Sequence, residues 1–171
     1  MSKYALLVVD MINEFVTGNL GCERGLAVVP KCVELLGGAQ AKGLPVIYCC
    51  DAHLPGDGEM KVWPAHAMAG TTEAQVIPEL APQSGEHIVY KRRYSGFWGT
   101  DLDMRLRELG VDGVIICGLL VNLCIQHTAA DAYLNGYEVM SPLTPPTPSA
   151  RRSMPTAWTI SPWPTARKPR L

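Results

Sequence analysis

Residues 111–124 read VDGVIICGLLVNLC: an apolar run reaches Cys117, Gly118 follows, and a second cysteine stands at Cys124. The run 111–117 is short and almost wholly apolar, which predicts a strand buried on both faces. Residues 122–135 have helical spacing and stop before Gly136, so a helix follows the strand after a few residues. A strand and helix joined so closely are typical of a parallel α/β sheet.

The same alternation continues in both directions along the chain. Further strands are predicted at 4–10 (YALLVVD), 44–51 (LPVIYCCD), 86–91 (EHIVYK) and 137–140. Helices are predicted at 28–42, closed by Gly43, and at 100–109, with Thr100 as N-cap and acids in the first turn. We therefore expect an α/β domain of three layers, α/β/α, with a mainly parallel sheet and right-handed crossovers.

Polar side chains stand at the carboxyl ends of the predicted strands. Asp10, Asp51 and Lys91 each end a strand, and Cys124 follows the fourth. Reactive groups of parallel sheets gather at this edge. The amides and dipole of a helix start would favour a Cys124 thiolate and supply oxyanion donors, although a small apolar core cysteine fits the same position. Asp10 fits either a base or a turn cap, and Lys91 either a charged partner of Asp10 or a loop residue.

Metal-binding residue types follow the second strand. Asp51 and His53 stand two residues apart, and His66 lies thirteen residues further on. One carboxylate and two imidazoles would leave open positions on Zn²⁺ or Fe²⁺, whereas two unrelated surface histidines would explain the same pattern. Phe15 and Trp63 either form the walls of a slot for a flat substrate or are ordinary core aromatics.

Four other basic side chains are assigned no chemical role. Arg92 and Arg93 are predicted to be solvated loop residues. His127 is treated as structural, because at i+3 from Cys124 it points only loosely toward the same face. His87, at the start of its strand, lies at the wrong end of the sheet.

Composition sets the broad class. The chain has 171 residues, 47% hydrophobic and 18% charged, and a net charge of −1, which suits one globular domain. We expect a cytoplasmic protein with free thiols and no membrane span, because no apolar run reaches about 20 residues and no signal pattern is present. Basic residues do not cluster on a folded face, so no nucleic-acid partner is expected.

The composition changes near residue 140. Eight of the 14 prolines lie in 141–171, together with five basic residues and no acid. We therefore predict a folded domain over 1–140 and an irregular Pro/Arg-rich tail over 141–171.

Taken together, these residues resemble the isochorismatase-like cysteine hydrolases, and within them the nicotinamidase-type branch. The matching segments follow the family's order over residues 4–140: 5–10 with Asn13 and Phe15, 51–53, 63–71, Lys91 with 94–97, and 118–132. The resemblance implies a triad in which Asp10 is the general base, Lys91 stabilises charge and Cys124 attacks an amide carbon. Ammonia is released and water then cleaves the thioester.

The resemblance also implies the remainder of the site. Asp51, His53 and His66 would hold Zn²⁺, Fe²⁺ or Mn²⁺ against the ring nitrogen of nicotinamide, the leading small amide substrate. A cis peptide would join Leu119 to Leu120, and the amides of Leu120 and Cys124 would form the oxyanion hole. Relatives are commonly homo-oligomers, and no organic cofactor is implied.

Two departures from the family keep alternatives open. Val121-Asn122 stands where the family has a polar pair such as Thr-Asp, and the 141–171 segment stands where the family has a further helix and strand. An uncovered sheet edge would make the protein less stable and more prone to aggregate. The alternatives are a hydrolase of carbamoyl or ureido compounds, an isochorismatase-type activity, and a domain without catalysis.

Overall fold

A computed structural model describes residues 3–141. Five strands form a single sheet in the order β3-β2-β1-β4-β5, with every neighbouring pair parallel. Their bounds are β1 Tyr4–Val9, β2 Val46–Asp51, β3 His87–Lys91, β4 Gly113–Gly118 and β5 Glu138–Met140. All five lie within two residues of the predicted positions, so the prediction of a parallel sheet is confirmed.

The helices follow the prediction less closely at their ends. Their bounds are α1 Asn13–Val16, α2 Glu23–Ala41, α3 Leu102–Glu108 and α4 Gln126–Leu134, with short turns η1 Gly58–Lys61, η2 Pro78–Leu80 and η3 Val121–Ile125. The helix expected over 122–135 is therefore divided, because η3 is a π-helical turn. The N-cap of α3 is Asp101 and not Thr100 as predicted. The Oγ1 of Thr100 nevertheless accepts a hydrogen bond from the Leu102 amide at 3.2 Å.

Helix α2 begins five residues before the predicted start. Pro30 and Gly25 both lie inside it and weaken the helical pattern in the sequence. Gly25 meets a tertiary requirement, because a Cβ there would lie 2.8 Å from the carbonyl oxygen of Phe15. Close packing of α2 against α1 therefore explains a glycine that the sequence pattern alone made unfavourable.

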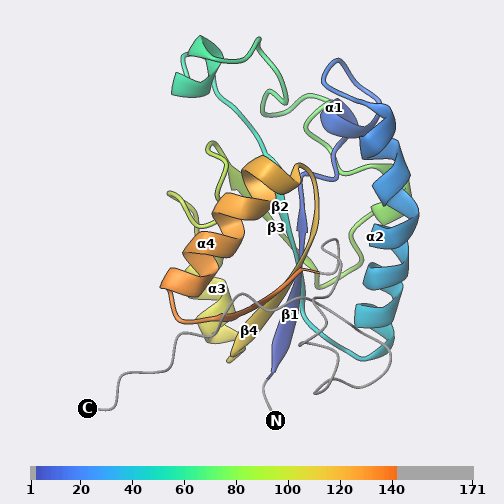
Figure 1. Cartoon of the computed structure of the whole chain (residues 1–171), viewed down its shortest axis with the longest axis vertical. Helices are drawn as coiled ribbons and strands as arrows, with labels where there is room; N and C mark the ends of the chain where they lie inside the picture. The colour runs from blue at the N-terminus through green and yellow to red at the C-terminus, as the bar shows by residue number, and fades with distance from the viewer. Residues whose placement is uncertain (1–2, 142–171) are drawn as a thin grey trace.

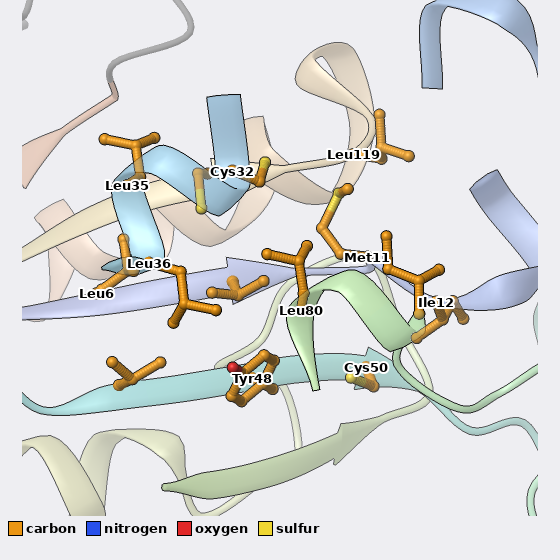
Figure 2. Close-up of a cluster of buried hydrophobic side chains, with 14 of the residues drawn as sticks. Leu6, Met11, Ile12, Cys32, Leu35, Leu36, Tyr48, Cys50, Leu80 and Leu119 are labelled. Atoms are coloured by element: carbon orange, nitrogen blue, oxygen red, sulfur yellow. The ribbon is translucent and has the colours of Figure 1, made fainter. Parts of the chain in front are cut away.

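Helix α2 covers one face of the sheet, and α3 and α4 cover the other (Figure 1). Alternate residues of β1 point to the two faces: Leu6 and Val8 pack toward α2, whereas Leu7 and Val9 pack toward the opposite helices. Figure 2 shows the α2 side, where Leu35 lies over the sheet among other buried side chains. The three-layer α/β/α architecture is confirmed.

The strand order creates a switch point between β1 and β4. From β1 the chain continues through β2 and β3 on one side, and it then crosses to β4 and β5 on the other. Ligands of open α/β sheets bind in the crevice outside the carboxyl ends of such strands. Gly118 allows the two strands to meet there, because it has φ of 126° and a Cβ would lie 1.9 Å from the Val9 carbonyl oxygen.

Two sequence expectations concern the remainder of the molecule. The expected irregular tail over 141–171 lies outside the described residues except for Ser141. Among residues 3–141, no helix is long and apolar enough to cross a bilayer.

Candidate active site

The three side chains predicted to form a triad meet at the switch point. Asp10 follows β1, Lys91 ends β3, and Cys124 lies in η3 after β4. The Lys91 Nζ lies 2.7 Å from Asp10 Oδ2 and 3.6 Å from Cys124 Sγ. It also lies 2.6 Å from Asp51 Oδ1, so one fully buried ammonium contacts two carboxylates and a thiol.

Asp10 is held in a conformation that few L-residues adopt. Its φ is 51°, in the left-handed region, and its amide donates to the Cys49 carbonyl at 2.9 Å. Its Oδ1 accepts the Asp51 amide at 2.8 Å, while its Oδ2 is ion-paired with Lys91 without a well-directed hydrogen bond. Burial, followed by the charge of Asp51, raises the pKa of Asp10 to about 6, against the opposing effect of Lys91.

Cys124 rests as a thiol. Burial, followed by the charge of Asp10, raises the pKa of Cys124 well above its ordinary value, and Lys91 only partly offsets this. This direction runs against the expectation that helix amides would favour a thiolate, because burial penalises the charged form of the thiol. The Cys124 sulfur and a carboxylate oxygen of Asp10 lie within 4.8 Å of each other, which places a proton acceptor beside the sulfur.

Lys91 stays charged despite its burial. Loss of water alone would lower the pKa of its ammonium, but the charges of Asp10 and Asp51 raise it well above the ordinary value. Asp10, Asp51 and Cys124 together form a group of metal-ligand type. Lys91 supplies the cation in contact with all three, so no additional ion is needed there.

The second group of metal-ligand type is Asp51, His53 and His66, whose ligand atoms lie within 4.8 Å of one another. The His53 Nε2 is buried without a hydrogen-bond partner, 3.6 Å from Asp51 Oδ2 and 3.8 Å from Glu59 Oε2. The His66 Nδ1 contacts the Pro64 carbonyl at 2.8 Å, which leaves its Nε2 as the ligand nitrogen. Two imidazoles beside carboxylates at non-bonding distance fit a divalent cation.

The outer side of His53 is held by residues that sequence reasoning missed or misassigned. The His53 Nδ1 lies 3.4 Å from Asp57 Oδ2. The Arg92 Nε donates to both oxygens of Asp57 at 2.9 Å, and its Nη2 also contacts Oδ1. Arg92 is therefore not simply a solvated loop residue, and Arg93 is half-buried rather than fully solvated. Asp57 is the N-cap of the short turn η1 and Glu59 lies within it, and a turn of this length leaves no periodic pattern in the sequence.

A small cavity of about 120 Å³ opens beside these groups. This volume is below the ~300–1,000 Å³ of typical ligand pockets. The cavity includes both aromatics expected from sequence, Phe15 and Trp63, and the Trp63 Nε1 donates to the Tyr94 hydroxyl at 2.9 Å. The lining residues are Asp10, Phe15, Leu20, Asp51, Glu59, Trp63, His66, Tyr94, Leu119, Leu120, Leu123 and Cys124. They include three carboxylates and, within the described part of the chain, no arginine or lysine.

Two backbone features complete the pocket floor. The peptide bond between Leu119 and Leu120 is cis, at the position that the resemblance implies. The Leu119 amide donates to the Val9 carbonyl at 3.0 Å, whereas the Leu120 amide makes no hydrogen bond among residues 3–141. A free amide at the pocket wall is of the kind that can stabilise an oxyanion.

A buried carboxylate, Glu14, joins two walls of the pocket. Its Oε1 accepts the amide of Leu20, and its Oε2 accepts the amide of Ala67, each at 3.2 Å. Leu20 lines the cavity, and Ala67 follows the lining residue His66. The sequence indicated no role for Glu14, because its partners lie in loops far apart along the chain.

The two remaining histidines lie where the sequence placed them. His127 is exposed, with its Nδ1 2.8 Å from the Leu123 carbonyl oxygen. His87 begins β3, and its Nδ1 lies 3.2 Å from Nη1 of Arg105. Neither lines the cavity.

Fold and side chains together define an α/β protein with a buried thiol, ammonium and carboxylate at the switch point of a parallel sheet. A family model for the Isochorismatase domain matches residues 4–142. The chain belongs to the isochorismatase family.

Named relatives are found by sequence and by structure. The N-carbamoylsarcosine amidase of Thermoplasma acidophilum is 41% identical, with a TM-score of 0.80 over 81% of this chain and 80% of that one. The nicotinamidase/pyrazinamidase of Mycobacterium tuberculosis is 31% identical over 148 residues, which cover 77% of this chain and 80% of the relative. A pyrazinamidase of Pyrococcus horikoshii in complex with zinc is 31% identical, with a TM-score of 0.75 over 81% and 83% of the two chains.

Proposed function

We propose that this isochorismatase-family amidohydrolase cleaves a small neutral carboxamide through a Cys124 thioester, with nicotinamide, giving nicotinate and ammonia, as the leading substrate. The observation that carries the proposal is the contact of one Lys91 ammonium with Asp10, Asp51 and Cys124 beside a small, mostly apolar cavity. The neutral thiol of Cys124 and the adjacent carboxylate of Asp10 form the pair of nucleophile and base that catalysis by cysteine requires.

The first half-reaction forms the thioester. Asp10 accepts the thiol proton while the Cys124 sulfur attacks the amide carbon, and the carbonyl oxygen becomes an oxyanion near the Leu120 amide. Asp10 then returns the proton to the amide nitrogen, the carbon–nitrogen bond breaks, and ammonia leaves. Lys91 stays protonated throughout and stabilises the thiolate as it forms.

The second half-reaction restores the enzyme. Asp10 accepts a proton from a water molecule while the water oxygen attacks the thioester carbon. The carbon–sulfur bond breaks, the carboxylic acid is released, and Cys124 recovers its proton from Asp10. The same carboxylate therefore serves as base and acid in both halves, which a pKa near 6 suits at neutral pH.

Asp51, His53 and His66 are proposed to hold a divalent metal ion, with zinc the first candidate because a relative is described in complex with it. A metal bound there would supply a Lewis acid that holds and orients the ring nitrogen of an aromatic amide. Phe15 and Trp63 would then pack against the ring. The remaining steps use only the side chains already named.

The charge of the lining favours a neutral amide over a substrate that carries a carboxylate. Carboxylate substrates are normally held by arginine or lysine, and the described lining has three acids and neither of these. The second candidate is a carbamoyl compound, favoured by the resemblance to N-carbamoylsarcosine amidase. A carbamoyl amino acid would bring its carboxylate into this acidic pocket, so we rank it second.

The test is ammonia release from nicotinamide, pyrazinamide, benzamide and N-carbamoylsarcosine by the zinc-loaded protein. We expect the aromatic amides to be cleaved with the highest kcat/KM and the Cys124→Ala variant to be inactive. Unchanged ammonia release by the variant would remove Cys124 from the mechanism. Preference for N-carbamoylsarcosine would replace the first candidate by the second.

A further inference from the structure

The inference concerns the far side of His53, away from the cavity. Its Nδ1 faces Asp57, whose side chain is almost fully buried, with an exposed fraction of 1%. Asp57 Oδ2 also accepts the Leu54 amide at 2.9 Å, so the carboxylate is fixed within its own turn as well as by Arg92. A buried acid with three directed contacts has one orientation available to it.

Arg92 connects this carboxylate to the catalytic strand. It directly follows Lys91 at the end of β3, and its Nε lies 2.9 Å from both oxygens of Asp57. The Arg92 side chain is half exposed, so water reaches the guanidinium while Asp57 stays dry. The arginine therefore supplies the countercharge that allows a buried Asp57 to remain ionised.

We propose that Arg92 and Asp57 form a positioning relay that sets the ring orientation and tautomer of His53 for a divalent metal ion. An ionised carboxylate only accepts hydrogen bonds, so the His53 nitrogen facing it must carry the proton. The other nitrogen, Nε2, then has its lone pair directed toward Asp51 and Glu59, where it lacks a hydrogen-bond partner. The relay rests on the proposed metal site, and it adds two residues outside the ligand set.

Outer partners of this kind typically contribute about 10–100-fold to metal affinity. Asp57→Ala is therefore expected to weaken Zn²⁺ binding by about 10–100-fold, and Asp57→Asn by less, because an amide oxygen can still accept the imidazole proton. Arg92→Gln should weaken binding several-fold in the parent protein and have no further effect when Asp57 is already alanine. This lack of additivity distinguishes a relay from two independent structural roles.

The experiment measures the Zn²⁺ dissociation constant by chelator competition, with all variants in a Cys124→Ala background so that the catalytic thiol does not bind zinc. The matched control is Arg107→Gln, which removes the same charge and an arginine–aspartate pair on α3, where Arg107 Nε lies 3.1 Å from Asp103 Oδ2. The control should bind zinc as the parent does. Circular dichroism melts establish that each variant is folded, and the half-exposed Arg92 provides a second route if Asp57→Ala does not fold.

Two results would overturn the relay, and they are distinguishable. If the parent binds zinc and both Asp57→Asn and Arg92→Gln bind it within twofold of the parent, the relay is wrong and the metal site stands. If neither the parent nor His53→Ala binds zinc, the proposed metal site is wrong and the relay is wrong with it.

Discussion

Replacing Lys91 by methionine removes a buried ammonium while keeping a side chain of similar length. In the native protein the ammonium lies 2.7 Å from Asp10 and 2.6 Å from Asp51, and all three side chains are at most 3% exposed. Removing one partner of a buried ion pair typically costs about 3–5 kcal/mol, because the remaining charge is left without compensation. We expect the free energy of unfolding at pH 7 to fall by about that amount in Lys91→Met.

The pH dependence of this loss provides the more demanding test. Without the ammonium, burial and mutual repulsion would raise the pKa values of Asp10 and Asp51 in the folded state above their unfolded value of about 4. An acid with a raised folded pKa destabilises the protein above that pKa, and the penalty disappears as pH falls toward the unfolded value. Urea denaturation of the parent and of Lys91→Met should show that the difference in their free energies of unfolding becomes smaller from pH 7 to pH 5. A deficit below about 1 kcal/mol, or one that does not change with pH, would refute the reasoning.

Three further outcomes follow from the described geometry. Because Asp10 must be ionised to accept the thiol proton and its pKa is raised to about 6, kcat/KM should fall about tenfold per pH unit below pH 6. The Asp10→Asn variant should lose at least about 10²-fold in kcat/KM. A pH profile that stays flat down to pH 5 would contradict this. Gly118→Ala should fail to yield soluble folded protein, since its Cβ would lie 1.9 Å from the Val9 carbonyl oxygen, and recovery of a normal melt would show that the strands can separate. Trp63→Phe should raise KM more than it lowers kcat and cost about 1 kcal/mol of stability through loss of the Tyr94 hydrogen bond, as measured by steady-state kinetics and a urea titration.

The fold was predictable because its main determinants are local. Runs such as 4–10 and 111–117 are mostly apolar, and the first ends in an acid while a glycine follows the second. Parallel topology then brings Asp10, Lys91 and Cys124 to one edge without any knowledge of side-chain packing. Asp51 and His53 follow from the same reasoning, because they stand at one strand end, whereas His66 was joined to them by its residue type and by the resemblance to the family.

What the sequence could not show depends on contacts between distant loops. The pairing of Asp57 with Arg92 joins residues 35 positions apart, and neither lies in a periodic segment. The burial of Cys124 was not predictable either, because a helix start is visible in sequence, whereas the depth of burial that raises the pKa of the thiol is not. The role of Gly25 is hidden from the sequence for a related reason, since its close approach to Phe15 is a tertiary property.

The bridge made by Glu14 affects how the pocket can respond to ligands. Because one carboxylate ties the Leu20 loop to the Ala67 loop, the two walls cannot move apart unless at least one of these hydrogen bonds breaks and the buried carboxylate loses a donor. Widening of the pocket entrance to admit bulkier compounds is therefore costly. The size of a substrate would then decide whether it can enter the pocket. Variants that shorten or neutralise this side chain are the natural starting point for broadening the range of amides accepted.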